Sequence, residues 1–469
     1  MPVDLVLRSL REAVATMLAA LATMACAWAI DPQPGAAILA LVLGVSLSRS
    51  QLDRDLHGRI EAAFTLPAVS LAALGVGVLL QRSPWLGAVL FVAGMSLPIW
   101  LRRFGPAWRR AGALIALPFV VILTTPHLPM SHEHVATALL LPVVIALLAL
   151  WWVAVAHALG RRLRWLPPPR IAPARPAMPA REASLRPPAS TRMAVQMAVA
   201  LATAFVVGYA FFAERWAWIV LTAYIVGSGN QGRLDVAYKS VLRVLGAAGG
   251  TVLALVFAFQ LGSHDATTVV LILVAVFLGL WLRPLGYAWW AFFVTLALAL
   301  LQGFEGTSAR QVLWPRLEEI VLGAVIGVAA AWFVWPVRST GVLRRRIADA
   351  LAALGAAMDP TSSARSSGPF EIALADVEKV APAFRAARHV TRGTQPADWA
   401  DALAACAAPA IVLIGEGETP VAVRRAIGAA RKAMREPQAI LAALVDLRDA
   451  LLASTSEVRA SSPSRRAAT

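Results

Sequence analysis

The sequence predicts an all-α integral membrane protein, with about twelve transmembrane helices arranged as two parallel six-helix repeats and a C-terminal cytoplasmic helical region. Three observations predict this fold class: the composition, the length of the apolar segments and an internal repeat. Of the 469 residues, 59% are hydrophobic and only 15% are charged, whereas about a quarter of a typical soluble chain is charged. So few charged residues cannot cover the surface of a soluble protein of this length, and we therefore expect much of the chain to face lipid.

Apolar segments long enough to cross a bilayer recur along the chain. A helix needs about 20 mostly apolar residues, at about 1.5 Å each, to cross roughly 30 Å of hydrocarbon. Full spans are expected at residues 13–30, 62–80, 84–101, 111–125, 135–159, 193–213, 241–259, 267–282, 287–301 and 320–335. Two shorter segments, 34–48 and 216–229, carry no charged residue and complete the set. None of these segments alternates with the period of two of a membrane β-barrel strand, so we expect helices.

The order of features in the first part of the chain recurs in the second part. An arginine precedes the first span of each part, at Arg11 and at Arg192, and LRRFG at 101–105 matches LRPLG at 282–286. Because each repeat has an even number of spans, both enter the membrane from the same side and the repeat is parallel. The expected domains are a first six-helix membrane repeat at 1–160, a Pro/Arg-rich cytoplasmic linker at 161–192, a second six-helix membrane repeat at 193–336, a cytoplasmic helical domain at 337–460 and a disordered tail at 461–469.

The arginines of the short loops predict the orientation. Most of them, including Arg102, Arg103, Arg283 and the cluster at 344–346, fall on the side of the N-terminus. Because positively charged short loops remain in the cytoplasm, both termini are expected there. The net charge of +16 then reflects this topology, and we expect no nucleic-acid partner.

After residue 336 the hydropathy falls, and the sequence is typical of soluble helices. Six apolar residues share one face at helical spacing: Val342, Leu343, Ile347, Leu351, Leu354 and Met358. Further amphipathic helices are expected at 371–392, 398–413, 421–435 and 438–452. The sequence leaves open whether this region forms a small helical bundle or a dimer contact.

Three segments of the second repeat carry a resemblance to a known family. They read WAWIVLTA at 216–223, RVLGAAGG at 243–250 and RLEE at 316–319, followed by Gly323 and Gly327. Together they resemble the fusaric acid resistance (FUSC-like) or aromatic acid exporter family, whose members have a tryptophan-led span, a basic loop and an R-x-x-G-T-x-x-G helix start. Here Ala247 stands where the family has threonine. The resemblance covers the second repeat well, the first repeat weakly and the C-terminal region hardly at all.

This resemblance implies a transporter in the inner membrane of a bacterial cell that exports aromatic or other organic carboxylic acids, such as fusaric-acid-like toxic anions. It implies a proton-coupled cycle of the antiporter type. The expected partners are the lipid bilayer and a small organic anion; a periplasmic membrane fusion protein and a homodimer are left open. The alternatives are an organic-anion channel of the malate-channel type and a divergent major-facilitator-like transporter, although the loop at 53–59 has the wrong spacing for the latter.

No catalytic residue, cofactor or metal is expected, and the chain is not predicted to be an enzyme. Two histidines, His132 and His134, stand two residues apart in an exterior loop, with His127 shortly before them. This spacing is weak evidence for a metal site, and a solvated loop is the simpler explanation.

Arg243 and its counterpart in the first repeat, Arg59, are the expected substrate-binding arginines. A guanidinium at the start of a membrane span either snorkels to the interface or lines an aqueous cavity, and the sequence leaves both open. If both arginines face the axis between the repeats, they form a cationic clamp that suits a carboxylate, because a guanidinium binds a carboxylate through two parallel hydrogen bonds. In the first repeat Ala62 and Leu66 replace the glycines of the motif.

The two short spans lie at matching positions in both repeats, which is the best sequence indication of a transporter site. In the second of them, Trp218 and Tyr224 could stack on an aromatic ring, and Asn230 could donate to a carboxylate. An interfacial aromatic belt is the alternative for Trp218.

Glu318 and Glu319, at the start of the last span, are the expected proton-coupling residues, because a carboxylate within the membrane can carry protons. The alternative is an ion pair with Arg316 that only fixes the depth of the helix. Gly246, Gly249 and Gly250 are expected to pack against another helix, since small residues at helical spacing let two backbones approach closely.

Overall fold

The structure is a computed structural model, and its described residues form helices throughout. These residues are 3–51, 56–105, 108, 112, 115–116, 118–120, 123, 135–166, 187–258, 265–304, 309–361, 365–388 and 396–461. Their side chains are described except at 3–5, 49–51, 56–64, 135–139, 258, 309–313 and 459–461. Within these ranges the chain forms α-helices and two short 3-10 helices and no strand. The predicted all-α class is therefore confirmed for the described part of the chain.

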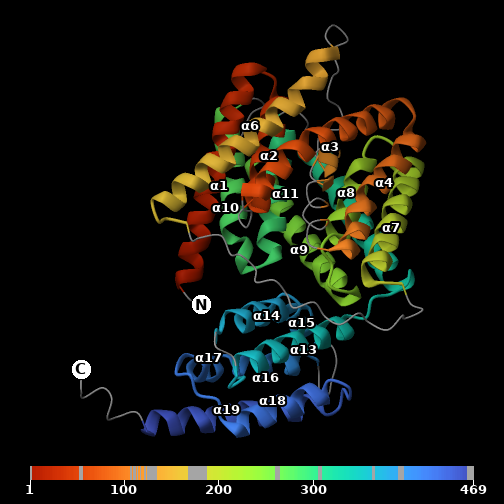
Figure 1. The fold of residues 1–469 in the computed structure, drawn as a ribbon. Coiled ribbons are helices and arrows are strands. Elements are labelled where there is room, and N and C mark those ends of the chain that lie inside the picture. Colours follow the sequence, from red (N-terminus) through yellow and green to blue (C-terminus); the bar gives the residue numbers. More distant parts are fainter. Residues whose placement is uncertain are drawn as a thin grey trace. The chain divides into compact units, whose positions relative to one another are not determined.

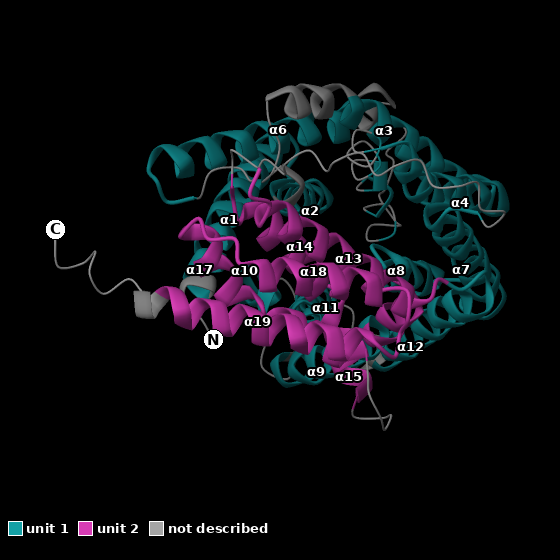
Figure 2. Ribbon diagram, turned by 60° about the horizontal axis from the view of Figure 1, so that its bottom comes forward, with its two compact units in different colours: residues 1–171, 181–230, 239–336 teal, residues 172–180, 231–238, 337–469 magenta. Residues whose placement is uncertain are grey.

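The chain divides into two compact units (Figure 2). Unit 1 contains residues 1–171, 181–230 and 239–336, and unit 2 contains residues 172–180, 231–238 and 337–469. The separate placement of residues 231–238 was not predicted from the sequence, which assigned them to the second membrane repeat. In unit 2 the backbone N–H of Leu234 donates to Ser339 Oγ at 2.9 Å, and the N–H of Arg233 donates to the carbonyl of Val337 at 3.1 Å.

Unit 1 contains two successive sets of helices (Figure 1). The first set is α1 (Val3–Ile30), α2 (Pro34–Gln51), α3 (Leu56–Arg82), α4 (Pro84–Leu101), the 3-10 helix η1 (Arg102–Phe104) and α6 (Val135–Arg162). The second set is α7 (Ala189–Phe211), α8 (Trp216–Gly227), α9 (Arg233–Ala258), α10 (Ala266–Leu282), the 3-10 helix η2 (Arg283–Leu285), α11 (Tyr287–Phe304) and α12 (Ala309–Phe333). Most of the span predicted at 111–125 and most of the proline-rich linker lie outside the described residues.

Nine helical stretches in the described part of the chain are long and apolar enough to cross a membrane. They are Val6–Ile30, Thr65–Arg82, Pro84–Phe104, Leu140–Arg162, Ala189–Phe211, Arg233–Phe257, Ala266–Leu285, Tyr287–Phe304 and Pro396–Gly415. Two shorter apolar helices, Pro34–Ser48 and Trp216–Gly227, coincide with the short spans predicted from the sequence. The helix α12 is not among the nine, and it carries Arg316, Glu318 and Glu319 in its first half.

Three helices of each set make corresponding contacts with one another. In the first set α1, α2 and α6 pack together, and in the second set α7, α8 and α12 pack together. The fourth long helix of each set packs against the first helix of the other, α4 against α7 and α10 against α1. Both of these fourth helices end in a 3-10 helix followed by a glycine, Gly105 after η1 and Gly286 after η2.

Small residues let the helices of unit 1 approach closely. A Cβ placed on Gly44 in α2 would lie 2.8 Å from the Cα of Ala20 in α1. A Cβ placed on Gly323 in α12 would lie 2.6 Å from the carbonyl oxygen of Ile219 in α8. Neither contact tolerates a side chain without a shift of backbone, so Gly44 lets α1 and α2 approach closely and Gly323 does the same for α8 and α12.

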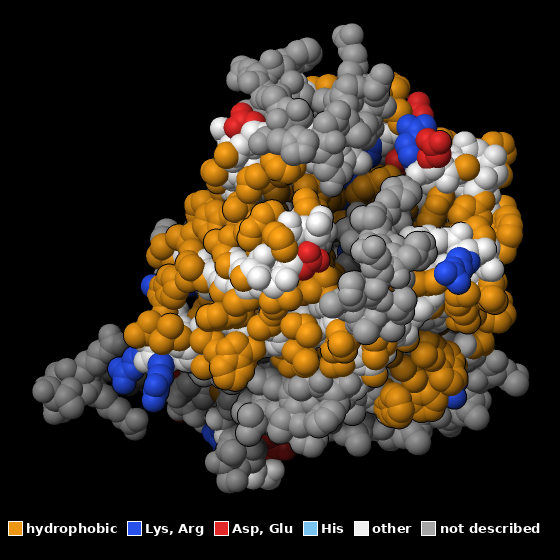
Figure 3. Space-filling model, turned by 90° about the horizontal axis from the view of Figure 1, so that it is seen from above, with side chains coloured by type: hydrophobic (Ala, Val, Ile, Leu, Met, Phe, Trp, Pro, Cys, Tyr) orange, Lys and Arg blue, Asp and Glu red, His pale blue; other side chains and the backbone are white. Residues whose placement is uncertain are grey.

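Large apolar side chains remain exposed on unit 1. They include Val89, Trp151, Phe211, Val325 and Phe333, and Phe333 is 85% exposed. Figure 3 shows hydrophobic side chains over much of the described surface on the face that it presents. A soluble monomer rarely exposes so large an apolar area, whereas such a surface is expected where helices face lipid.

Unit 2 has an apolar core of its own. Its helices are α13 (Ser339–Ala357), α14 (Gly368–Glu378), α15 (Ala381–Arg388), α16 (Pro396–Ala405), α17 (Ala407–Gly415), α18 (Val421–Ala433) and α19 (Ile440–Ser461). Five residues of the predicted amphipathic face are fully buried in it: Leu343, Ile347, Leu351, Leu354 and Met358. The apolar stretch Pro396–Gly415 consists of α16 and α17, whose residues Leu403 and Leu413 lie in this core.

Two of the helices predicted after residue 336 are each broken in two. The segment predicted as one helix at 371–392 forms α14 and α15, and the segment predicted at 398–413 forms α16 and α17. Pro382 is the second residue of α15, and Pro409 is the third residue of α17. Proline lacks the N–H that would continue the preceding helix and is tolerated in a first turn, so a new helix begins just before each proline.

Candidate functional site

Two arginines are buried among the described residues of unit 1. Arg243 on α9 is 3% exposed, and Arg316 on α12 is 2% exposed. An arginine inside a membrane protein is costly unless it is paired, and it marks a functional site by default. The burial of these two arginines therefore indicates a functional site in unit 1.

Arg316 has two neighbours of different kinds. Its Nη1 donates to Gln302 Oε1 of α11 at 2.6 Å, and the guanidinium lies 3.8 Å from the centroid of the Trp218 ring of α8. The ring face attracts a cation, and the amide oxygen accepts one of its hydrogens. Among the described residues, however, the buried Nη2 of Arg316 has no hydrogen-bond partner. This side chain therefore keeps a donor available inside the protein.

Arg243 has still fewer partners. Its Nε is buried without a hydrogen-bond partner among the described residues, and it lies within electrostatic range of the Tyr287 side chain on α11. A buried donor that is left unpaired costs about 1–3 kcal/mol, and more for a charged group. Arg243 and Arg316 also lie within range to repel each other. An anion placed between or beside these guanidinium groups would relieve both costs.

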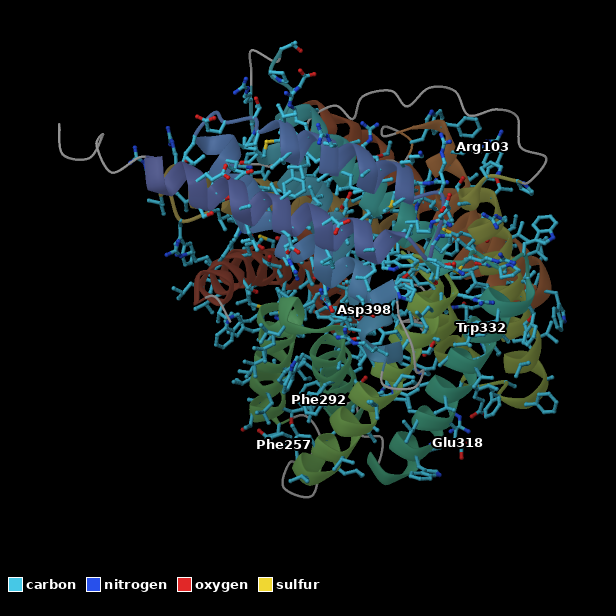
Figure 4. All side chains as sticks on the ribbon, turned by 90° about the horizontal axis from the view of Figure 1, so that it is seen from below. Arg103, Phe257, Phe292, Glu318, Trp332 and Asp398 are labelled. Atoms are coloured by element: carbon cyan, nitrogen blue, oxygen red, sulfur yellow. The ribbon has the colours of Figure 1, made fainter. Side chains whose placement is uncertain are left out.

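The backbone of α9 explains why Arg243 is held against α11. Gly246 follows Arg243 by one helical turn, and a Cβ placed on it would lie 2.6 Å from the carbonyl oxygen of Ala288. A Cβ on Gly249 would lie 3.0 Å from the ring of Phe292, and one on Gly250 would meet the carbonyl of the same residue. Figure 4 labels Phe292 on α11, and Phe257 on α9 packs in the same apolar cluster. The three glycines therefore let α9 lie directly on α11.

The two arginines lie at different levels along α11. Tyr287 is its first residue and Gln302 is near its end, and at about 1.5 Å per residue they are about 22 Å apart along the axis. Arg243 interacts with the former and Arg316 with the latter. The two side chains therefore start from different levels of α11, while their guanidinium groups remain within electrostatic range of each other.

One buried carboxylate accompanies these cations. Glu319 on α12 is 1% exposed, and its Oε1 lies 3.3 Å from the Nε of Arg215, whose side chain is 45% exposed. The same Oε1 makes no hydrogen bond among the described residues, so the contact is an ion pair without hydrogen-bond geometry. Glu319 is the buried acidic residue in the described part of unit 1. Arg215 and Arg316 lie within electrostatic range of this carboxylate. With Arg243, there are three guanidinium groups for one buried carboxylate in the described part of unit 1.

The other residues singled out from the sequence are more widely spread. Glu318 is exposed on α12 (Figure 4), next to buried Glu319. Tyr224 packs in the apolar cluster that also contains Trp218, six residues earlier on α8, a separation of about 9 Å along the helix. Asn230 is 8% exposed, and its Oδ1 is buried without a described partner.

Arg59 belongs to α3, but its side chain is not among those described, so the pairing of Arg59 with Arg243 stays a prediction. The histidines at 127, 132 and 134 also lie outside the described residues. The described geometry therefore tests neither the clamp between Arg59 and Arg243 nor the histidine loop.

Sequence reasoning missed two members of the cluster. Arg316 was considered only as an ion-pair partner for the glutamates, whereas the structure places it between Trp218 and Gln302. Gln302 was not considered, although a lone amide near the end of an otherwise apolar helix is a recognisable signal. In both cases the deciding fact is a contact between different helices, which the sequence does not display.

The buried arginines, Glu319 and the residues that contact them all fall in a segment that is similar to known proteins. Residues 198–335 match the family model described as fusaric acid resistance protein-like. The resemblance inferred from the sequence is therefore confirmed for this segment, which contains α8 to α12 entirely. The long apolar helices indicate a multi-pass membrane protein, and the match shows that residues 198–335 are similar to this family.

One curated relative extends the comparison. The chain is 26% identical over 183 residues to a protein of Escherichia coli (strain K12) named "Uncharacterized protein YhfK". The alignment covers 38% of this chain and 25% of that protein, so the chain matches about a quarter of its relative's length. No solved structure matches the chain.

Proposed function

We propose that the chain is an efflux transporter for organic anions of the fusaric acid type, with its anion site at Arg243 and Arg316. The observation that carries the proposal is the excess of positive charge: two buried guanidinium groups and that of Arg215 accompany one buried carboxylate within the segment that matches the family. A carboxylate fits the unused donors of a guanidinium through charge-assisted hydrogen bonds. Arg243, Arg316 and Gln302 bind the anion, and Trp218 lies beside it.

The two levels of positive charge give the anion a path. An organic acid leaving the cytoplasm meets Arg243 first in the orientation predicted from the loop arginines, and then passes to Arg316. Each step exchanges one set of charge-assisted hydrogen bonds for another of similar strength, so the anion is not trapped at either. Tyr224 and Asn230, further along the chain from Trp218, are proposed as further contacts of the substrate along this path.

Proton coupling is proposed to act through Glu319, with Glu318 beside it at the surface. The ion pair of Glu319 with Arg215 connects α12 to the turn between α7 and α8, on the side assigned to the exterior. A proton arriving from outside neutralises Glu319 and breaks this connection, so the exterior side opens and the anion leaves. This order of events corresponds to exchange of a proton for an anion.

The equivalent contacts of the two helix sets support a further part of the proposal: the membrane region is a parallel tandem repeat of six helices, with both termini in the cytoplasm of a bacterium and unit 2 on the same side. The matching packing of α4 on α7 and of α10 on α1 supports the repeat, and the arginines of the short loops support the orientation. Dimer formation and a periplasmic partner protein are compatible with it.

The test is an efflux screen with matched variants. A strain that lacks the gene is supplied with the wild-type protein, Arg243→Ala or Arg82→Ala and challenged with a panel of aromatic carboxylic acids; Arg82 is an exposed arginine at the end of α3. Resistance that depends on Arg243 and not on Arg82 supports the site. Equal resistance with Arg243→Ala at normal abundance refutes it. Unchanged flux with Glu318 and Glu319 both replaced by glutamine favours the organic-anion channel.

A further inference from the structure

Two threonines of unit 1 bury hydroxyl groups that the proposed anion site does not use. Thr251 on α9 is 6% exposed, and Thr295 on α11 is 1% exposed. Neither hydroxyl has a hydrogen-bond partner among the described residues. A hydroxyl that is held away from water without a partner costs free energy, so its presence at both positions requires an explanation.

The two helices that carry these threonines run in the same direction. Gly246 of α9 packs on Ala288 of α11, and one turn later Gly250 packs on Phe292, which Figure 4 labels. Each step of four residues on α9 therefore corresponds to a step of about four residues on α11. Positions equally far along the two helices lie at the same level.

The threonines lie about midway between the two levels of the anion site. Thr251 follows Arg243 on α9 by eight residues, and Thr295 follows Tyr287 on α11 by the same number. Since Arg243 interacts with Tyr287, the two threonines share one level, about 12 Å further along the helices. The level of Gln302 lies seven residues beyond Thr295, or about 10 Å. Three levels of polar groups therefore follow one another at nearly equal intervals.

Other buried threonines in the described helices pair their hydroxyls within their own helix. Thr16, Thr23 and Thr455 each donate to the carbonyl oxygen of the residue four positions earlier, at 2.8, 2.8 and 2.7 Å. A threonine in the interior of a helix has such a carbonyl within reach. Thr251 and Thr295 do not make this bond, so their hydroxyls remain available to a ligand.

Three further threonines have buried hydroxyls without a partner in the described part of the chain. Thr191 and Thr268 are each the third residue of a helix, so the residue four positions earlier lies outside that helix. Thr222 lies inside α8 and follows Trp218 of the anion site by one turn. The unpaired threonines in described helix interiors therefore all belong to α8, α9 and α11, the helices that carry the site.

A purely structural role does not explain hydroxyls at these positions. Valine has the shape of threonine and avoids the cost of an unpaired hydroxyl. The threonines also stand between two other unused donors, the Nε of Arg243 and the Nη2 of Arg316, neither of which has a partner among the described residues. A ligand with acceptor oxygens that moves along α11 satisfies all of these donors in turn.

We propose that Thr251 and Thr295 bind the carboxylate of the transported anion midway between Arg243 and Arg316. Each hydroxyl donates its hydrogen to a carboxylate oxygen, and these neutral donors hold the carboxylate less strongly than a guanidinium does. The anion therefore passes from one arginine to the other without losing all of its hydrogen bonds and without being trapped. This inference rests on the proposed function and names two further ligands of its substrate.

The first test is efflux of benzoate from loaded proteoliposomes by matched double variants. Thr251→Val/Thr295→Val removes both hydroxyls and keeps the shape of both side chains. We expect its initial rate to fall about tenfold, the effect of one lost hydrogen bond to a charged group. Thr251→Ser/Thr295→Ser keeps both hydroxyls and should stay within about twofold of wild type. Wild-type efflux by the valine variant, or an equal loss in the serine variant, overturns the proposal.

The thermal unfolding midpoint separates a ligand from a structural role. The valine variant should unfold at the wild-type temperature or above it, because it loses no hydrogen bond of the described chain. Thr23→Val is the control: Thr23 is fully buried in α1 and donates to the carbonyl of Ala19. This control should unfold at a lower temperature and keep wild-type efflux. A midpoint of the valine variant that is lower than that of Thr23→Val contradicts the proposal.

A second test measures whether an anion reaches Thr295 and does not depend on transport. The native cysteines, Cys26 and Cys406, are replaced by alanine, and Thr295→Cys is treated with 2-sulfonatoethyl methanethiosulfonate, an anionic thiol reagent. Ala297→Cys is the matched control, because Ala297 is 6% exposed and lies in an apolar cluster of the same helix. We expect Thr295→Cys to react about tenfold faster than the control, and benzoate to slow the reaction. Equal rates, or no protection by benzoate, overturn the proposal.

The two tests separate this inference from the proposed function. If Arg243→Ala abolishes efflux and the valine variant does not reduce it, the proposed function stands and the threonine ligands are refuted. If the wild-type protein exports no organic acid but benzoate protects Thr295→Cys, efflux is refuted and the anion-binding position stands.

Discussion

The two helix sets of unit 1 bury different polar groups, although corresponding helices pack together in both. In the first set, α1, α2 and α6 enclose a chain of hydroxyl and imidazole groups, Thr16, Ser48 and His157, with no buried carboxylate or guanidinium among its described residues. In the second set, α8, α9, α11 and α12 surround two buried guanidinium groups and one buried carboxylate. Corresponding triplets of helices, α1, α2 and α6 in the first set and α7, α8 and α12 in the second, pack together in both. The packing of a set is therefore independent of the polar groups that it holds.

This difference teaches that the fold and the function of the membrane region depend on different residues. Glycines and alanines at the contacts determine how close the helices come. The proposed anion site, in contrast, depends on a few buried polar residues, because a guanidinium inside a membrane protein needs an anionic or hydrogen-bonding partner. Substitutions of the glycines at the helix contacts and of the buried polar residues test this separation.

The largest effect is expected for Arg243→Ala in the second set. Efflux of an aromatic carboxylate from loaded proteoliposomes should fall about 100-fold, since removing one partner of a buried charge pair costs several kcal/mol. Arg243→Lys should retain part of the rate, because it keeps the charge and loses the fork of donors. The measurement is the initial rate of efflux at equal protein content, and a rate indistinguishable from wild type in Arg243→Ala would break the comparison.

A smaller effect is expected for Glu319→Gln. The amide keeps the volume of the side chain and removes the charge that pairs with Arg215 at 3.3 Å. Efflux driven by an imposed pH gradient should fall about tenfold, while flux down the gradient of the anion persists. Glu318→Gln is the matched control, since its side chain is exposed, and equal losses in both variants would contradict a special role for Glu319.

The glycines of both sets should act on stability alike. Gly44→Ala and Gly246→Ala should each destabilise the protein by about 1–3 kcal/mol, because a methyl group has no room against Ala20 or Ala288. Gly75→Ala on α3 is the control, since a Cβ there meets nothing within 4 Å, and it should be neutral or stabilising by up to about 1 kcal/mol. Thermal unfolding midpoints in one detergent measure the three variants, and a common shift for all three argues against close packing.

The smallest effect is expected for Gln196→Ala in the second set. The variant loses the hydrogen bonds of one amide to the carbonyls after α12, which should cost about 1 kcal/mol of stability. Efflux should not change, because Gln196 donates only to backbone carbonyls and lies outside the proposed anion site. A loss of efflux in Gln196→Ala as large as that in Arg243→Ala would contradict the assignment of the site.

The apolar segments and the helical class were predictable because they depend on the composition of single stretches of chain. Segment 216–229 was predicted as a short span, and α8 extends over Trp216–Gly227. The buried face of α13 was equally predictable, because its apolar residues recur at helical spacing. Leu343, Ile347 and Leu351 are fully buried. The breaks before Pro382 and Pro409 could have been predicted from the positions of those prolines.

The composition of the sites was less predictable because each depends on contacts between helices distant in sequence. Arg243 could be selected as a charge inside an apolar span, but the contacts of Arg316 join residues that are 14 and 98 positions apart, Gln302 and Trp218. The chain from Thr16 to His157 joins residues of three helices. Serine, threonine and histidine are common in apolar helices, and the sequence does not show that these three meet.

Equilibrium binding of an aromatic carboxylate to the purified protein tests the central claim most directly. Wild-type protein and the double variant Arg243→Ala/Arg316→Ala are compared by calorimetric titration with fusaric acid in the same detergent, with Arg82→Ala as the control. The account predicts saturable binding to wild type and to the control, and none to the double variant. Binding of wild-type affinity by a folded double variant would contradict it.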